Sequence, residues 1–134
     1  MENSSIEFIV QYADTDAYKV AWHGSYLRWM EAGRVDLLYK NNIDIKEMDE
    51  KYGVVVPVIE IDIKYKQSAK LFDEVVVETK VIDSTCYSMS FEQIIKNKNT
   101  GAILTTATVK GVAVQAQTGK IFRKLDKIVN GEEI

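Results

Sequence analysis

Residues 59–66 read Ile-Glu-Ile-Asp-Ile-Lys-Tyr-Lys, so apolar or aromatic side chains alternate with charged ones along the whole run. Successive side chains of a β-strand point to opposite faces, and this period of two predicts a strand with one covered and one wet face. The same pattern returns at residues 74–82, 87–96 and 102–114. The turn sequences KNKNTG and QTGK separate or follow these segments, so we expect long strands joined by hairpins.

A helical period replaces this alternation in the first part of the chain. Apolar residues recur every three or four positions between His23 and Tyr39, which predicts a helix with one buried stripe. The stripe consists of Tyr26, Met30, Gly33 and Leu37. Glycine inside a helix costs about 1 kcal/mol relative to alanine, so we expect a close contact between helix and sheet at Gly33.

Shorter elements flank this helix. Residues 6–12 predict a first strand, and the pair Asn41–Asn42 is suited to end the long helix. A second, shorter helix is expected over residues 45–51, and a short strand or helix over residues 121–129.

The order of these elements predicts an α+β fold in one domain, residues 1–134, with a mostly antiparallel five-stranded sheet and the long helix packed on one face. One helix cannot cover both faces of such a sheet. Residues 75–77 and 102–114 also carry apolar or small side chains on both sides. We therefore expect a second copy of the chain to supply cover, in a homodimer or homotetramer.

Composition excludes several classes of function. A net charge of −3 over 134 residues offers no basic surface for nucleic acid, and no apolar run is long enough to span a membrane. His23 is the only histidine and Cys86 the only cysteine. The chain therefore lacks the ligands of a typical zinc site and the second cysteine of an internal disulfide. We expect no cofactor. The N-terminal residues lack the features of a signal peptide, and a cytoplasmic location is expected.

The stretch from Tyr12 to Tyr26 concentrates the chemistry, because Asp14 and Asp16 lie in a loop just before the long helix. A helix N-terminus presents unpaired backbone N–H groups, which can stabilise an oxyanion. A nearby carboxylate can act as a nucleophile or activate water, as acyl transfer requires. An aspartate at this position is more often a helix cap or part of a turn, and the spacing alone favours that interpretation for both residues.

The run Y-x-D-T-D-x-x-x-V-x-W-H-x-x-Y-L-x-W-M-E-x-x-R, residues 12–34, resembles the signature of the 4-hydroxybenzoyl-CoA thioesterase family. Within that family it is similar to the short bacterial acyl-CoA thioesterases. The resemblance implies a hotdog fold, in which a mostly antiparallel five-stranded sheet wraps a long central helix. It also implies hydrolysis of an acyl-coenzyme A to a carboxylic acid and free coenzyme A.

The resemblance assigns roles to single residues. Asp16 falls on the catalytic carboxylate, either nucleophile or general base, and His23 falls on the histidine at the helix start, where the backbone N–H polarises the thioester carbonyl. Gly24 lies beside it at the same helix start and is expected to contact the substrate. Tyr26 matches a tyrosine that packs or lines the pocket. Glu31 and Arg34 match polar helix positions, for which a structural role is expected.

One pair of residues departs from the family pattern. Relatives usually carry glycines where this chain has Tyr18 and Lys19, which implies a different loop path or a side chain inside the acyl pocket. We hypothesise that Tyr18 or Lys19 narrows or polarises the acyl end of the site. The phosphates of coenzyme A need cations, and the candidates at the end of a strand are Lys64, Lys66 and Lys70.

Two other functions remain open at this point. A hotdog hydratase or dehydratase acting on acyl thioesters would use an acid and a histidine in differently placed motifs. A non-catalytic acyl-CoA-binding protein would keep the fold without the reaction, and the Tyr18–Lys19 pair is the one feature that invites it.

Overall fold

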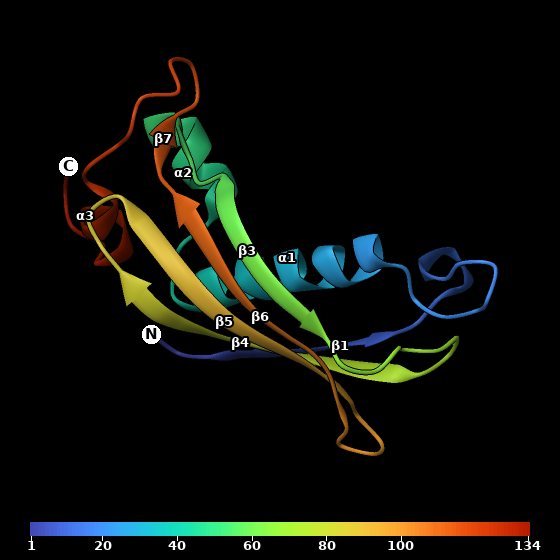
Figure 1. Cartoon of the computed structure of the whole chain (residues 1–134). Helices are drawn as coiled ribbons and strands as arrows, with labels where there is room; N and C mark the ends of the chain where they lie inside the picture. Colours follow the sequence, from blue (N-terminus) through green and yellow to red (C-terminus); the bar gives the residue numbers. More distant parts are fainter.

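The computed structural model describes all residues from Met1 to Ile134. Its main sheet has five strands in the order β1-β4-β5-β6-β3, and every neighbouring pair is antiparallel. These strands are β1 (Ser4–Ile9), β3 (Val58–Tyr65), β4 (Glu74–Ser84), β5 (Ser88–Asn97) and β6 (Ile103–Val112). Figure 1 shows the long helix α1 (His23–Lys40) lying across the strands on one face of this sheet. The predicted α+β architecture is confirmed.

The remaining elements are short. They are η1 (Tyr12–Asp14), α2 (Ile45–Tyr52), β2 (Val54–Val55), β7 (Val114–Gln115) and α3 (Leu125–Val129). Strands β2 and β7 pair with each other in a separate two-stranded sheet, which the alternation pattern did not predict because two residues carry no period. No helix in the chain combines the length and apolar character needed to span a membrane.

The helix stripe predicted from the period is the buried one. Tyr26, Met30, Gly33 and Leu37 are all buried against the sheet. A Cβ atom added at Gly33 would lie only 2.6 Å from Oγ1 of Thr79 and 3.0 Å from Cγ1 of Val77. The expected close approach of helix to sheet at Gly33 is therefore confirmed.

The face of the sheet away from α1 is mostly polar. Val76 lies on it between the buried Val75 and Val77, as expected, but most of its neighbours there are charged or polar. Ion pairs cross it between β4 and β5, from Lys80 to Glu92 at 3.4 Å and from Lys96 to Glu78 at 2.8 Å. Such a face can remain in water without a covering layer. The surface that lacks cover lies instead along the edge strand β3, whose only sheet neighbour is β6.

The ends of the elements follow their local chemistry. The pair Asn41–Asn42 ends α1, as predicted: Asn41 is the C-cap residue and Asn42 has a left-handed backbone (φ 64°). Asp44 caps α2 by accepting from Lys46 N and Glu47 N. The first strand was predicted to end at Tyr12, but it ends at Ile9, because residues 12–14 form a short 3₁₀ helix.

Candidate active site

The loop before α1 contains a tight turn that begins at Asp16. Thr15 and Ala21 form a β-bridge at the base of the turn. Asp16 N donates to Val20 O at 3.0 Å, and Lys19 N donates to Asp16 O at 3.0 Å. One carboxylate oxygen of Asp16 accepts from the backbone of Tyr18 at 2.8 Å, and the chain provides no partner for the other. Asp16 is exposed, so its second oxygen is available to a ligand.

Asp14 has a different environment, although it lies only two residues earlier. Its side chain is buried, forms an ion pair with Arg28 and accepts from Gln11 N at 2.8 Å. Its backbone carbonyl accepts from Trp22 N at 3.2 Å and from Ser25 Oγ at 2.9 Å. Asp14 therefore ties the loop to the start of the helix and has little capacity left for a substrate.

The N-terminus of α1 has unused hydrogen-bond donors. Trp22 is the N-cap residue and its side chain does not cap the helix. The backbone N–H groups of His23 and Gly24, the first two helical residues, have no acceptor within the chain. These donors and the helix dipole favour a partial negative charge beside them. Gly24 makes room for the Trp22 indole, because an added Cβ would lie 2.2 Å from that ring.

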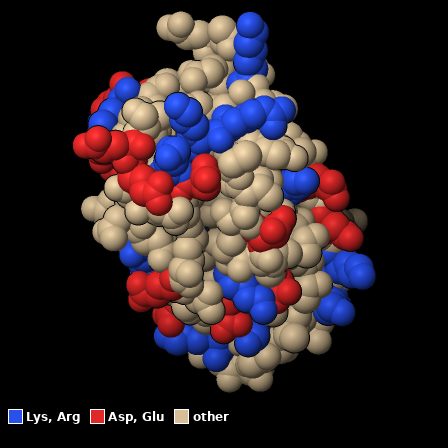
Figure 2. Space-filling view, turned by 90° about the vertical axis from the view of Figure 1, so that its left-hand side faces the viewer, with Lys and Arg blue, Asp and Glu red and all other residues tan.

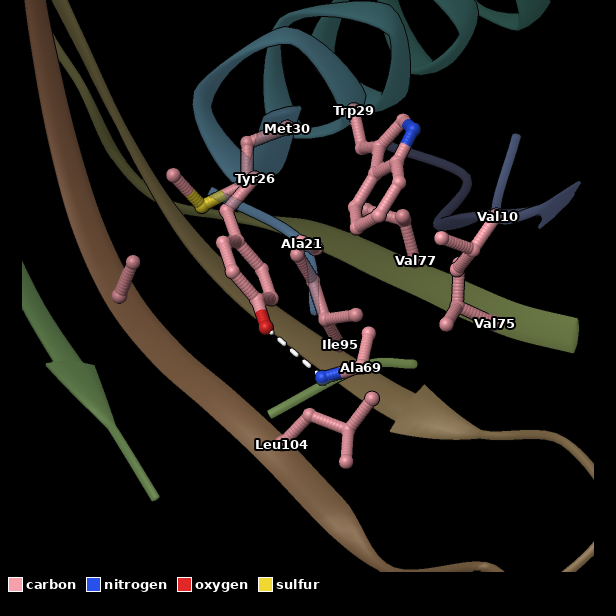
Figure 3. Packing of buried hydrophobic residues seen from close by; sticks show 11 residues of the cluster. Val10, Ala21, Tyr26, Trp29, Met30, Ala69, Val75, Val77, Ile95 and Leu104 are labelled. Carbon is pink, nitrogen blue, oxygen red and sulfur yellow. Dashed lines mark hydrogen bonds between the residues drawn. The ribbon is translucent and has the colours of Figure 1, made fainter. Parts of the chain in front are cut away.

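An aromatic cluster supports this end of the helix. The ring of Tyr65, at the end of β3, lies 6.3 Å from the His23 ring and 5.3 Å from the Tyr26 ring, measured between centroids. Figure 3 shows the Tyr26 hydroxyl pointing at Ala69, whose backbone N–H donates to it at 2.8 Å. Burial raises the pKa of both tyrosines, although the bond from Ala69 opposes the shift at Tyr26. Tyr26 is thus a packing residue with a satisfied hydroxyl.

A second loop, residues 66–73, runs beside the first. Ala21 N donates to Ala69 O at 2.8 Å, and Leu71 N donates to Lys19 O at 3.1 Å. Lys70 forms a β-bridge with Val20, so one of the three predicted phosphate-binding lysines does lie beside the Asp16 loop.

The other two lysines have different positions. Lys66 is exposed directly after β3, where its backbone N–H donates to Leu104 O at 2.8 Å. Lys64 pairs with Thr106 in the register and alternates with Ile63 and Tyr65, which face the helix. Its side chain therefore points to the polar face of the sheet, away from His23, so the structure does not bring it together with Lys70 beside the Asp16 loop. The alternation of the strand already indicates this face.

The Tyr18–Lys19 pair keeps a backbone that glycine favours. Lys19 has φ 62°, in the left-handed region. The substitution of the usual glycine therefore does not by itself demand another loop path. Tyr18 is 86% exposed and lines none of the chain's larger cavities, so it is not inside an acyl pocket of this chain.

A large and mostly apolar cavity lies beside the second half of α1. It has a volume of about 540 Å³ and is bounded by the middle of α1, by α2, by the segment Val55–Val58 and by strands β5 and β6. None of the predicted catalytic or substrate-binding residues lines it, although Glu31 and Arg34 do.

Figure 2 shows that acidic and basic side chains are interspersed on the left-hand face of the molecule.

Two residues of the site had been missed. Arg28 stands at an unspecified position of the motif, and its pairing with Asp14 depends on how the loop folds back on the helix. Tyr65 belongs to the alternating run of β3. This alternation predicts which face of the sheet Tyr65 occupies, but not its contact with His23. The chain contains no group of three or more His, Cys, Asp or Glu side chains arranged to hold a metal ion.

Comparison with known proteins relates this geometry to a family. A family model described as the thioesterase-like superfamily matches residues 10–129. The protein YneP of Bacillus subtilis is 32% identical over 126 residues, which cover 92% of this chain and 90% of that protein. The acyl-CoA thioesterase YbgC of Haemophilus influenzae is 35% identical over 105 residues, covering 78% of this chain and 76% of YbgC.

Solved structures agree with this relationship. The DHNA-CoA thioesterase of Staphylococcus aureus superimposes with a TM-score of 0.87 at 31% identity, over 95% of this chain and 83% of that one. The predicted hotdog fold is confirmed by this similarity.

Proposed function

The chain belongs to the thioesterase-like superfamily, and from this premise we propose that it hydrolyses the thioester bond of an acyl-coenzyme A with Asp16 as the acting carboxylate. One observation carries the assignment to Asp16. Of the two acids in the loop, Asp14 uses its carboxylate to hold the fold, whereas Asp16 keeps an oxygen free in the loop that leads into the uncapped start of α1.

The reaction needs two things from these residues. The thioester carbonyl oxygen points to the backbone N–H groups of His23 and Gly24, which stabilise the negative charge that develops there. The Asp16 carboxylate either attacks the carbonyl carbon, giving a mixed anhydride that water then opens, or removes a proton from the water that attacks. Coenzyme A leaves as a thiolate, which is a good leaving group because the ordinary pKa of a thiol is only about 8.5. The His23 imidazole assists in orienting the thioester.

Substrate contacts are proposed for the residues that surround Asp16. Tyr18 and Lys19 form the turn that carries its carboxylate, and Lys70 lies on the neighbouring loop. Lys70 and Lys66 supply cations for the phosphates of coenzyme A. Both are exposed, so they can reach a nucleotide outside the fold. We propose the cytoplasm as the location of this activity.

We further propose that β3 pairs with β3 of a second copy in a homodimer. Ile61 and Ile63 pair with the buried Val109 and Ala107 and therefore face the helix side, yet Ile61 is 37% exposed. Ile59 is 59% exposed and Tyr65 48%. An unpaired edge with exposed apolar side chains is a template for another strand. Sedimentation should give a dimer or tetramer for the wild type, and Ile61→Lys should give a monomer; a monomeric wild type would contradict the pairing.

The function is tested by free-thiol release from short, medium, long and aromatic acyl-CoAs. We expect at least one substrate to be hydrolysed by the wild type and not by Asp16→Asn. Asp83→Asn is the matched control, because Asp83 is exposed at the far end of β4 and should be replaceable without loss. Full activity of Asp16→Asn would remove Asp16 from the mechanism. Loss of enoyl absorbance without thiol release would favour a hydratase, and tight binding without turnover a binding protein.

A further inference from the structure

Arg34 is a cation placed inside the apolar cavity. It lies in the middle of α1, is half-buried and lines the cavity together with apolar side chains of the sheet and of α2. The other charged residues of the lining are Glu31, Lys46 and Asp49. Its Nη1 donates to Oε1 of Gln93 at 2.9 Å. Gln93 is fully buried and donates in turn to Met30 O at 2.8 Å and to Thr79 Oγ1 at 2.9 Å. These bonds fix the position of the guanidinium.

The charge of Arg34 has no counterion. No carboxylate oxygen lies within ion-pair distance, and the neutral amide of Gln93 is its only hydrogen-bond partner. Burial lowers the pKa of the guanidinium, and the charge of the exposed Glu31 on the same helix partly opposes this. A guanidinium carries five N–H donors in a planar fork, so several remain unfilled. A partly desolvated cation with free donors is stabilised by an anionic or oxygen-bearing ligand.

The cavity and the Asp16 loop lie at opposite ends of β3. Val58, at the start of the strand, lines the cavity, whereas Tyr65, at its end, contacts His23. Eight residues of strand separate the two ends by about 23 Å. In an antiparallel pairing of two β3 strands about a two-fold axis near Asp62, the start of one strand lies beside the end of the other. The Val58 end of one protomer, which borders its cavity, then lies beside the Tyr65 end of the partner.

We propose that Arg34 selects the acyl group of the substrate by binding an oxygen at the end remote from the thioester. The preferred substrates are then medium-length acyl groups with an apolar body and a terminal carboxylate or hydroxyl. Their apolar part occupies the cavity, and the terminal oxygen accepts from the free N–H groups of Arg34. This inference rests on the proposed thioesterase function and on the β3 pairing.

The test compares three coenzyme A thioesters of equal chain length, octanoyl, 8-hydroxyoctanoyl and suberyl (octanedioyl). The wild type should have the higher kcat/KM for the two oxygenated substrates. Arg34→Met should lower that preference by about 10- to 100-fold, the range of a hydrogen bond to a charged group, while hydrolysis of octanoyl-CoA persists. Arg34→Lys should retain part of the preference for suberyl-CoA, which separates loss of charge from loss of folding.

Lys46→Met is the matched control, because Lys46 also borders the cavity but is largely exposed and pairs with Glu50. Its preference should equal that of the wild type. An equal loss in Lys46→Met would mean that the general charge of the region selects the substrate, and would overturn the role of Arg34. A preference for 8-hydroxyoctanoyl-CoA alone would assign the selection to a hydroxyl acceptor, and one for suberyl-CoA alone to a carboxylate.

A binding measurement separates this inference from the proposed function. Calorimetry with Asp16→Asn should give tighter binding of suberyl-CoA than of octanoyl-CoA, and Asp16→Asn combined with Arg34→Met should not. Such a difference without turnover in the wild type would refute the thioesterase function but support the selection by Arg34. Turnover by the wild type with no preference in either measurement would refute the selection and leave the function intact.

Discussion

Polar groups have opposite environments at the two halves of α1. Beside the middle of the helix, Gln93 of β5 and Thr79 of β4 are buried, and each polar atom of the Gln93 amide has a hydrogen-bond partner. At the N-terminus, one oxygen of Asp16 and the backbone N–H groups of His23 and Gly24 have none. Buried polar groups need hydrogen-bond partners within the protein, whereas exposed polar groups can bind water or a ligand. The difference separates the part of the helix that stabilises the fold from the part that can act on a substrate.

The same contrast exists within the loop, between Asp14 and Asp16, and replacing each with asparagine gives the largest expected effect. Asp16→Asn should lower kcat/KM by about 100- to 10,000-fold, the usual contribution of a general acid or base, with an unchanged melting temperature. Asp14→Asn should instead lower the free energy of unfolding by about 1–3 kcal/mol, because Arg28 and Gln11 lose a charged partner. Kinetics and thermal melts of both variants check this. A stable Asp14→Asn with full loss of activity would reverse the two roles.

Gln93→Leu tests the buried hydrogen-bond network beside the middle of α1. The variant removes the hydrogen bonds to Arg34, Thr79 and the carbonyl of Met30 at once, so the free energy of unfolding should fall by about 2–4 kcal/mol. Chemical denaturation measures the loss. Glu92→Gln, the neighbouring residue on the polar face, should change stability by no more than about 0.5 kcal/mol. Equal stability of the two variants would show that the buried network contributes little.

Gly33→Ala probes how tightly this half is packed. The new methyl group would lie 2.6 Å from Thr79 Oγ1, so helix or sheet must move, and we expect a loss of about 1–3 kcal/mol. Helix propensity alone predicts the opposite, a gain of about 1 kcal/mol. Thermal melts distinguish the two, and a variant more stable than the wild type would mean that the contact adjusts freely.

Ser4→Ala tests the link between β1 and the helix. Ser4 Oγ donates to Asp36 at 2.5 Å, and this bond, together with Lys40, holds the pKa of Asp36 below its ordinary value. The resulting stabilisation is present above the ordinary pKa of an aspartate and is lost as pH falls through the lowered value. Ser4→Ala should cost about 1 kcal/mol at pH 7 and less under acid conditions. A cost that does not shrink at low pH would exclude this carboxylate as the cause.

Lys19→Gly should have the smallest effect, at the open end of the helix. Glycine accepts the left-handed backbone at this position without strain, and we expect a gain of about 0.5 kcal/mol after the greater freedom of the unfolded chain is subtracted. Lys19→Ala is the control and should show no gain. Equal stability of both variants would mean that the turn does not strain Lys19.

The amino-acid sequence was sufficient for the architecture because that architecture rests on local periods. The period of two in residues 59–66 and the helical stripe through Met30 and Leu37 both describe which side of an element is apolar. The motif around Asp16 likewise led to the family, since it combines many residue types with fixed spacing. These properties depend on neighbours along the chain, and a sequence displays them directly.

The ion pair that holds the buried Asp14 could not be predicted from such local properties. It depends on whether Arg28, fourteen residues later, folds back onto one acid or the other. The meeting of Tyr65 with His23 and the cavity around Arg34 depend in the same way on contacts between distant segments. Such contacts arise only when the sheet has its register and the helix lies against it, because the free energy of each pairing is shared among many residues that are far apart in the chain.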